Sequence, residues 1–456
     1  MSVKSVIETI EKESIVDNLS NEKVEAKEVV STSEEAVNLN KLAELRAKNQ
    51  AKQQEKKNEE KKIERSVEFS FIGSGQCGNR LAAAWASKGY SAIAINTASQ
   101  DLKHIGLPDK AKCLLKQEFQ GASKELAIGK AAAENNRQAI IDCINANLTN
   151  GQINVLCTSL GGGSGAGSVE TMIDILSEMG KPIIVQTVLP MDSEDSLIKQ
   201  NALETLQKLL GYARDKKIAN LIVADNAKIE NIFQNLSPVS FYDTANEAMI
   251  SPLDTFNVYS SKPSPMKGLD PMEFLKIMVD SEGLTVYGSM EVANYQEDTA
   301  IAECVVNSLD GNLLASGFNL KEAKYVGFMI IAPKKIWEAI PSSSANYALA
   351  MLNDICQPKS IFKGMYVSSD DTKNTVEVVS IFSGMGLPES RVLSLKEQVK
   401  ASAATIKGKE EARNLTLTLD TGDATVSQAQ KLKEKIANKS STFGKMTNGQ
   451  VIDRRK

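Results

Sequence analysis

The chain has 456 residues, a formal net charge of −4 and 42% hydrophobic residues, a composition typical of a protein with one or more sizeable globular cores. Its six cysteines form no CxxC pair, no segment resembles a signal peptide and no apolar run reaches membrane-spanning length. The sequence therefore predicts reduced thiols, no zinc site, no membrane span and a cytoplasmic location. A single histidine, His104, argues against imidazole-based catalysis.

The two ends of the chain differ from its middle in charge and hydrophobicity. Residues 1–35 hold nine acids and four bases, and residues 41–65 hold nine bases and five acids, with almost no apolar residue after Leu45. Because such segments have no apolar face to bury, we predict that residues 1–66 are a charged, mobile extension. Electrostatic docking to a partner is the alternative. Residues 431–456, with eight bases and two acids, are predicted to be a basic tail.

Short apolar runs alternate with helical patterns in the first half of the remaining chain. The runs at 67–72, 90–96, 153–157, 182–189 and 219–225 are typical of buried strands, and 79–89 and 168–180 are typical of helices. This alternation predicts a parallel sheet with helices on both faces. Ligands of such sheets bind at the carboxyl ends of the strands.

Two glycine-rich segments follow predicted strands. The first, GSGQCGN (Gly73–Asn79), satisfies the dinucleotide pattern GxGxxG, but Asn96 and Thr97 occupy the place where that pattern needs an acid. The second, GGGSGAG (Gly161–Gly167), lacks the GK[ST] ending of a P-loop. Either segment alone could be a tight turn. Two at one sheet edge favour backbone N–H groups that bind phosphate.

The motifs resemble those of the tubulin and FtsZ superfamily of GTPases. GGGSGAG resembles its signature loop, GQCGNR resembles the first phosphate loop of tubulin, and INTASQDL is similar to the loop after the second strand. The resemblance runs from about Val67 to about Leu395 and is greatest to the plasmid- and phage-borne TubZ-like branch, which has counterparts of LIVADNAKIENIF, DPMEF and GMGLPESRV.

The resemblance implies an α/β fold: a Rossmann-like GTPase domain with a parallel sheet, a long central helix and a second α+β activation-type domain. The β-rich runs at 325–333, 360–367 and 375–384 fit the second domain, and 390–414 is typical of a long helix. The predicted limits are the extension at 1–66, the GTP-binding domain at 67–238, the central helix at 239–262, the second domain at 263–390, a C-terminal helix and following segment at 391–430, and the tail at 431–456.

The same resemblance implies GTP or GDP with Mg²⁺ as the ligand. The residues assigned to the phosphates and the adjoining loops are Gly75, Gln76, Cys77, Asn79, Asn96, Gly121, Ala122, Ser123, Gly161, Gly162, Gly163, Ser164, Gly165, Ala166 and Gly167. Of these, Gly121–Ser123 would sense the γ-phosphate, and Gln76 would hold a water on the magnesium.

Base and sugar contacts are assigned on the central helix and on the loop PMDSED. Tyr242 would stack on guanine, and Asn246, one helical turn later, would bond its donors. Glu194 would hold the ribose hydroxyls, with Asp192 as the alternative. Pro252 is expected to kink or interrupt the central helix soon after Asn246.

Asp270 and Glu273 in KGLDPMEFLKIM lie three residues apart at a predicted helix start. An acid-rich helix N-terminus is the plainer interpretation. The resemblance implies instead that these carboxylates enter the nucleotide site of the next subunit and complete GTP hydrolysis there.

The predicted function is a GTP-hydrolysing, tubulin-like protein that assembles head to tail into filaments and segregates or positions plasmid or phage DNA. The globular part has no nucleic-acid motif, so a DNA-bound adaptor protein is the expected link. The alternatives are a non-polymerising GTP-binding regulator of a filament system and a division-type or phage-positioning cytoskeleton without a partition complex.

Overall fold

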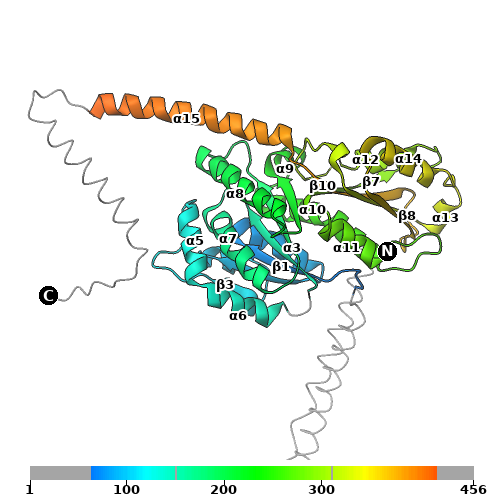
Figure 1. Ribbon diagram of the computed structural model, residues 1–456, viewed down its shortest axis with the longest axis horizontal. Coiled ribbons are helices and arrows are strands. Elements are labelled where there is room, and N and C mark those ends of the chain that lie inside the picture. Colours follow the sequence, from blue (N-terminus) through cyan, green and yellow to red (C-terminus); the bar gives the residue numbers. More distant parts are fainter. Residues whose placement is uncertain (1–62, 149–150, 310–311, 418–456) are drawn as a thin grey trace, which may run out of the picture. The chain divides into compact units, whose positions relative to one another are not determined.

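The computed structural model describes residues 63–148, 151–309 and 312–417 (Figure 1). Most of the extension predicted at 1–66 and all of the tail predicted at 431–456 lie outside the described residues. From Glu64 onward, the described residues belong to one compact unit.

Within the described residues, one ten-stranded sheet has the order β3-β2-β1-β4-β5-β6-β7-β10-β8-β9. Its first six strands along the chain are β1 (Phe69–Ser74), β2 (Ser91–Asn96), β3 (Lys112–Leu114), β4 (Ile153–Ser159), β5 (Ile183–Leu189) and β6 (Asn220–Asp225). Neighbours among these six pair in parallel. β1, β5 and β6 are buried along their whole length, as expected for unbroken apolar strands covered on both faces.

The sheet continues without a gap into the second half of the chain. Its remaining strands are β7 (Gly283–Val292), β8 (Tyr325–Ala332), β9 (Ser360–Val367) and β10 (Val376–Met385). β7 pairs in parallel with β6 through Asn220–Ile222 and Gly283–Thr285, and β8 pairs in parallel with β9. β10 is antiparallel to both β7 and β8, so it alone among the described strands runs in the opposite direction. The mixed sheet expected for a second domain is therefore joined to the first.

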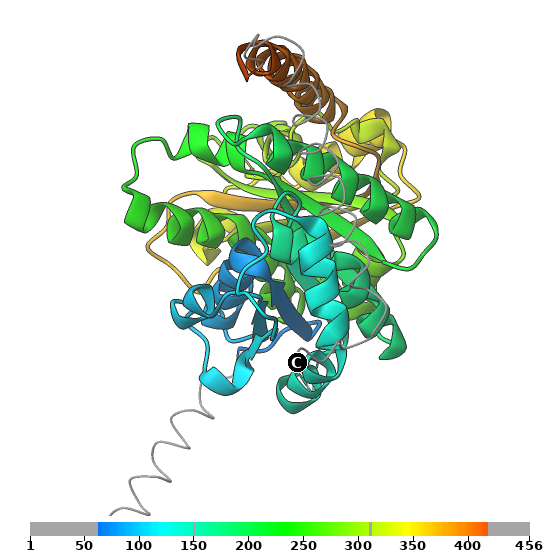
Figure 2. The same ribbon diagram turned by 90° about the vertical axis from the view of Figure 1, so that its left-hand side faces the viewer.

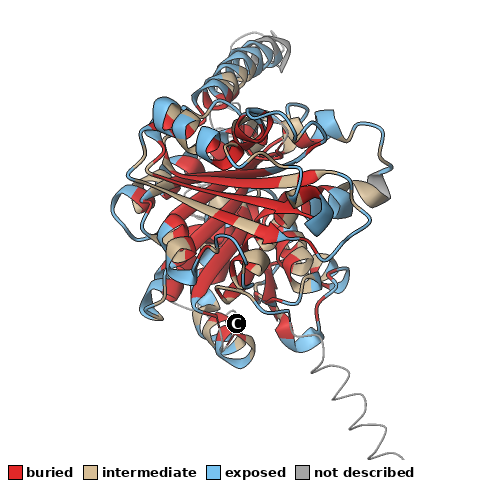
Figure 3. Ribbon diagram, turned by 90° about the vertical axis from the view of Figure 1, so that its right-hand side faces the viewer, coloured by how far each residue is buried: buried red, intermediate tan, exposed pale blue. Residues whose placement is uncertain are grey.

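Helices cover both faces of this sheet, and buried residues concentrate in the strands and the helix sides that face them (Figures 2 and 3). The helices are α3 (Gly75–Ser87), α4 (Ser99–Lys103), α5 (Leu126–Asn135), α6 (Arg137–Asn147), α7 (Gly163–Glu178), α8 (Ser196–Arg214), α9 (Asn226–Ile232), α10 (Pro238–Ser260), α11 (Pro271–Val279), α12 (Ala300–Asn307), α13 (Lys334–Trp337), α14 (Ser344–Cys356) and α15 (Glu389–Leu417), with 3-10 turns η1 (Asp109–Ala111) and η2 (Leu320–Glu322).

The predicted central helix is α10, and it is not interrupted. It begins after Ser237, whose side chain accepts a hydrogen bond from the Ser240 amide, and it continues through Pro252 to Ser260. Of the two effects expected at Pro252, a kink or an interruption, the interruption was wrong, because tertiary packing outweighs the local cost of proline. α10 contacts α3, β7 and β10, and it buries Ile250 and Phe256 completely.

The predicted C-terminal helix is α15, which extends along α8 in Figure 1. Val392 and Leu395 in its first turns are buried, whereas nearly all described side chains between residues 400 and 410 are exposed. Only the beginning of α15 is therefore held by packing.

Candidate nucleotide-binding site

A cavity of about 260 Å³ lies at the carboxyl ends of β1, β4, β5 and β6. The predicted ligand-binding residues that line it are Gly75, Gln76, Cys77, Gly161, Gly162, Gly163, Ser164, Gly165, Glu194, Tyr242 and Asn246. The structure thus brings together both glycine-rich segments, the loop after β5 and one face of α10. This is the sheet edge at which a parallel α/β fold binds its ligands.

Both glycine-rich segments form helix starts rather than free loops. α3 begins at Gly75, and α7 begins at Gly163, so each helix starts earlier than the sequence predicts. No side chain caps either N-terminus. Backbone N–H groups of the two first turns are therefore available to an anion, and both helix dipoles favour negative charge there.

Glycine is needed where the two helix starts touch. Gly75 has a φ of 72°, and a Cβ added to it would lie 2.8 Å from the backbone nitrogen of Gly165. A Cβ added to Gly165 would lie 2.7 Å from the carbonyl oxygen of Ser74 and 2.8 Å from Thr158 Oγ1. Both directions point into protein and not into the cavity. These glycines therefore allow close backbone packing, in addition to any approach of phosphate.

Hydroxyl pairs fix the start of α7 against the neighbouring strands. Ser164 Oγ lies 2.6 Å from Thr97 Oγ1 in the loop after β2, and Ser168 Oγ lies 2.6 Å from Ser74 Oγ at the end of β1. Ser164 lines the cavity and can still accept or donate one further bond. Burial raises the pKa of the nearby Cys77 thiol to about 12, so this thiol is neutral and at most a weak donor.

Two amides point to recognition of a base at the other end of the cavity. Asn246 on α10 is 9% exposed, and Asn226 begins α9 directly after β6. Both line the cavity, and in the part of the chain that the structure describes neither side-chain amide has a hydrogen-bond partner. Tyr242 is 39% exposed, and the Arg80 guanidinium carbon lies 4.3 Å from its ring centroid. The aromatic ring and the two amides could hold a planar, hydrogen-bonding base.

The loop after β5 separates the two acids considered for the sugar. Glu194 lines the cavity, and its Oε2 accepts a hydrogen bond from the Met191 amide at 2.8 Å. Asp192 is bonded instead to Arg391 and Gln398 of α15. Of the two acids, Glu194 is the one placed where it could meet a ligand.

Several predicted residues do not line the cavity: Asn79, Asn96, Gly121, Ala122, Ser123, Ala166 and Gly167. Asn79 is fully buried, and its amide both donates to and accepts from the backbone of Ile95, which braces β2 against α3. Asn96 donates to Asp101 at 3.0 Å. Residues 121–123 lie against the start of α7, where a Cβ on Gly163 would meet Ala122.

The cavity also contains residues that the sequence analysis did not assign, among them Arg80, Asp101, Asn226, Ile198 and Met249. Asp101 lies 3.5 Å from Gln76 Nε2, which places a carboxylate beside the first glycine-rich segment. Asn226 could have been found, because it is the first residue after a strand that ends at this edge of the sheet. Ile198 and Met249 carry no such signal, since apolar helix residues are usually core.

Asp270 and Glu273 do not line the cavity. Glu273 N donates to Asp270 Oδ1 at 2.8 Å, and Asp270 N donates to Glu273 Oε2 at 3.0 Å, which is a reciprocal capping box at the start of α11. Asp270 is exposed and Glu273 is half-buried, and both border a separate hollow of about 390 Å³ together with Pro182, the residue before β5. This acid pair therefore lies at the amino ends of the strands, opposite the cavity.

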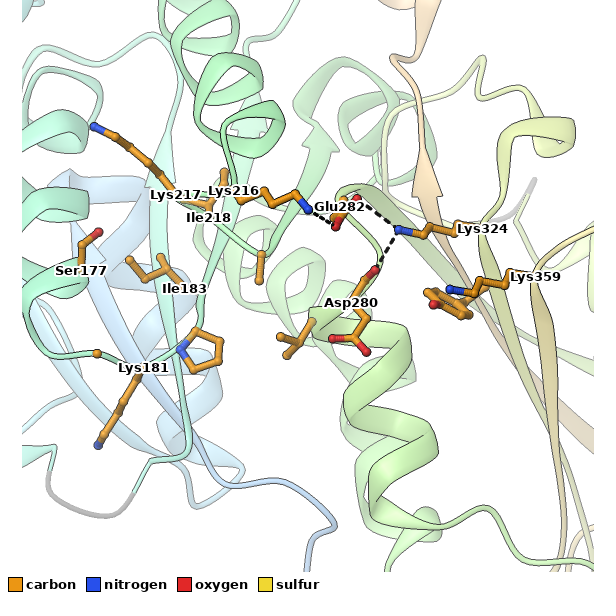
Figure 4. A pocket seen from close by; sticks show the side chains of 15 residues that line it. Ser177, Lys181, Ile183, Lys216, Lys217, Ile218, Asp280, Glu282, Lys324 and Lys359 are labelled. Atoms are coloured by element: carbon orange, nitrogen blue, oxygen red, sulfur yellow. Dashed lines mark hydrogen bonds and ion pairs between the residues drawn. The ribbon is translucent and has the colours of Figure 1, made fainter.

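A larger hollow of about 760 Å³ also lies at the amino ends of the strands (Figure 4). Its charged lining residues are Lys181, Lys216, Lys217, Lys324, Lys359, Asp280 and Glu282. Figure 4 shows Lys216 and Lys324 meeting at Glu282, at 2.7 and 3.2 Å. Loops that precede strands form this hollow, and flexible lysines rather than helix N-termini supply its donors. The smaller cavity is the better candidate for phosphate binding.

Comparison with known proteins agrees with this choice. Residues 68–234 match the model of the Tubulin/FtsZ family, GTPase domain. The tubulin-like protein CetZ of Pyrococcus abyssi is 24% identical over 348 residues, which cover 75% of this chain and 92% of that protein. None of the described helices is long and apolar enough to cross a membrane.

Solved structures with the same fold include two structures of TubZ. A GTPγS-form protofilament of TubZ from Bacillus thuringiensis serovar israelensis superposes with a TM-score of 0.67 at 19% identity, covering 77% of this chain and 95% of that chain. A type III plasmid segregation TubZ superposes with a TM-score of 0.62 at 19% identity, covering 75% and 94%. The chain therefore carries, at residues 68–234, a GTPase domain of the Tubulin/FtsZ family within a tubulin/FtsZ fold.

Proposed function

We propose that the protein binds and hydrolyses GTP and assembles head to tail into filaments, in which each subunit completes the active site of the next. The placement of the cavity and the acid pair at opposite edges of one sheet supports this. A subunit cannot bring its own Asp270 and Glu273 to its own cavity. A second copy stacked along the strand direction can, through a heterologous contact that repeats without closing.

In this proposal the cavity holds the nucleotide in one orientation. Asn226 and Asn246 meet the guanine edge, Tyr242 stacks on the base, and Glu194 accepts from the ribose hydroxyls. The starts of α3 and α7 bind the phosphates. Asn79, Asn96, residues 121–123, Ala166 and Gly167 do not line the cavity and support the adjoining loops and helix starts. Asn226 is an addition to the residues assigned from the sequence.

Mg²⁺ fits the phosphate end of the cavity. Gln76 and Asp101 face one another there and offer the oxygen atoms that this hard cation prefers. These two side chains, one from α3 and one from α4, cannot fill an octahedral shell by themselves. The ion would therefore be held mainly by the phosphates and by waters that Gln76 and Asp101 orient.

Exposed apolar side chains support assembly through the same two edges. Phe119, in the loop after β3, is 79% exposed, and Met272, in the first turn of α11, is 71% exposed. They are the two most exposed large apolar side chains among the described residues, and they lie at the carboxyl and amino edges respectively. A head-to-tail contact would remove both from water.

For the biological role, we propose that the filaments segregate or position plasmid or phage DNA in the cytoplasm through a DNA-bound adaptor protein. The resemblance to TubZ, including a plasmid segregation TubZ, supports this. The similarity to CetZ favours a second candidate, a cytoskeletal filament without a partition complex.

Electron microscopy and sedimentation of the purified protein with GTP, GDP and no nucleotide test the proposal. We expect filaments with GTP and their disappearance as GTP is consumed. A GTP-binding protein that stays in the supernatant under all three conditions would instead be a non-polymerising regulator. Filaments that co-sediment with DNA only after a second protein is added would support the adaptor.

A further inference from the structure

Arg391 joins three groups at the candidate nucleotide cavity, of which Pro190 lines the cavity and Asp192 and Asp225 do not. Its Nη1 donates to Asp192 Oδ1 at 2.7 Å, its Nη2 donates to the carbonyl oxygen of Pro190 at 2.8 Å, and its Nε lies 2.8 Å from Asp225 Oδ2. Arg391 is only 9% exposed and does not line the cavity. A guanidinium holds its N–H donors in a rigid, planar fork that can reach acceptors several ångströms apart, whereas the three donors of a lysine ammonium share one nitrogen on a flexible stem.

Each of these three partners is connected to a residue that does line the cavity. Pro190 follows β5, lines the cavity itself and starts the loop that carries Glu194. Asp225 ends β6, and its Oδ1 accepts from the Ala227 amide at 3.1 Å, which fixes the turn that presents Asn226. Arg391 thus ties together the strand ends that supply the base and sugar contacts.

The charge balance around Asp225 makes this tie hard to replace. Burial raises the pKa of the Asp225 carboxyl, and the Arg391 guanidinium opposes that rise. The Asp225 side chain is 5% exposed, so loss of the guanidinium would leave a buried carboxylate without its charged partner.

Arg391 belongs to α15, so the tie also connects this helix to the cavity. Gln398, two turns further along, donates to the same Asp192 Oδ1 at 2.9 Å. Leu395, between them, is fully buried. The start of α15 and the loop 190–195 therefore form one hydrogen-bonded unit. A displacement of either one would strain or break the hydrogen bonds to the other.

We propose that Arg391 is a positioning residue for guanine-nucleotide binding, and that it couples the docking of α15 to occupation of the base and sugar end of the cavity. This inference rests on the proposed function. It assigns to α15 a role in nucleotide affinity that is separate from assembly.

The test is the affinity and dissociation rate of fluorescent GDP and GTP, measured on the full chain at concentrations below assembly. For Arg391→Gln we expect a loss of about tenfold in GDP affinity, within the range typical of coupling between sites. The ratio of GTP to GDP affinity should stay at the wild-type value, because the helix starts that bind phosphate are untouched. Arg391→Lys should recover only part of the loss. Lys396→Gln, an exposed cation on the same helix, is the matched control and should bind as wild type does.

Hydrogen exchange provides a readout that a merely structural role would not change. GDP should slow amide exchange in residues 389–400 of the wild type, and this protection should be lost in Arg391→Gln. If that variant does not fold, Asp192→Asn removes the negative charge of the most exposed partner while keeping an acceptor oxygen, and it should show the same effects to a smaller extent.

The outcomes separate this inference from the proposed function. A wild-type chain that binds no GDP contradicts the proposed function. If the wild type binds GDP and Arg391→Gln binds it with equal affinity, only the inference is overturned. The same holds for Asp192→Asn if Arg391→Gln does not fold. A changed ratio of GTP to GDP affinity also overturns it, because the effect would then act through the phosphates.

Discussion

At the scale of single residues, the glycines of the cavity allow close backbone packing in addition to the phosphate binding that the sequence predicts. Their density correctly indicates a close backbone approach, but the sequence cannot say what approaches. For Gly165 the neighbours are Ser74 and Thr158, residues about ninety and seven positions earlier in the chain that only the sheet brings near. The glycine pattern therefore identifies the site, while the reason for each glycine depends on the tertiary structure.

Gly165→Ala should destabilise the fold, and not simply block the ligand. We expect a decrease of about 1–3 kcal/mol in the free energy of unfolding, because the new methyl group overlaps the carbonyl of Ser74. Urea unfolding without nucleotide measures this. Gly211→Ala in α8 is the control: nothing lies within 4 Å of its added Cβ, and it should stabilise the protein by about 0.5–1 kcal/mol. If Gly165→Ala has normal stability but no longer binds nucleotide, then glycine is needed at this position for contact with phosphate and not for packing.

Two asparagines that the sequence treats alike should respond in opposite ways. Asn246→Ala should unfold as the wild type does but lose roughly tenfold in GTP affinity relative to ATP, because it removes a partner of the base. Asn79→Ala should lose about 1–3 kcal/mol of stability, because two backbone groups of Ile95 lose their partner. Thermal unfolding and nucleotide competition distinguish the two variants. If the two variants lost nucleotide affinity equally, the assignment of Asn246 to ligand contact and of Asn79 to structural support would be contradicted.

At the scale of elements, α11 shows why the acid pair has two interpretations. The sequence predicts both a helix start and a catalytic pair at Asp270 and Glu273. The capping box confirms the helix start but does not test the catalytic role. A local pattern can fix a cap because all of its atoms lie within four residues. It cannot fix a catalytic role that depends on another subunit.

Asp270→Asn separates the cap from the catalysis. Asparagine caps helices as well as aspartate does, so the free energy of unfolding should stay near the wild-type value. GTP hydrolysis in filaments should fall by a factor of about 10² to 10⁴ if the carboxylate acts on the attacking water. Asp270→Ala is the companion variant and should also lose about 1 kcal/mol of stability. If Asp270→Asn filaments release phosphate at the wild-type rate, Asp270 only caps α11 and has no part in hydrolysis.

The alternation of apolar runs and helical patterns predicted five strands of the first half of the sheet, β1, β2, β4, β5 and β6, but not the short edge strand β3. The junction between β6 and β7 was not predictable, because Asn220–Ile222 pairs with Gly283–Thr285 across the intervening helices α9, α10 and α11. The contact between Arg391 and Asp225 was not predictable for the same reason, because the two residues are far apart in the sequence. Patterns in sequence report local periodicity, and long-range pairing leaves little trace in them.

At the scale of the whole molecule, the proposal predicts a catalytic rate that depends on protein concentration. If the acid pair acts across an interface, GTP turnover per subunit should be near zero in dilute protein and should rise steeply above a critical concentration. Phosphate release measured over a dilution series, alongside sedimentation, provides the test. Adding Asp270→Asn subunits to wild type should slow disassembly of mixed filaments. Turnover per subunit that is independent of concentration would place the whole active site within one chain.

The common direction of the strands has a consequence for any polymer built in this way. All described strands except β10 run the same way, so loops that follow strands gather at one edge and loops that precede them gather at the other. A head-to-tail stack of such subunits is therefore polar, with different edges of the sheet exposed at its two ends. One tip of the polymer would present an open nucleotide cavity, and the other would present an acid pair with no phosphate to act on. The two tips would therefore gain and lose subunits at different rates, and the polymer could travel by growing at one tip while it shortens at the other.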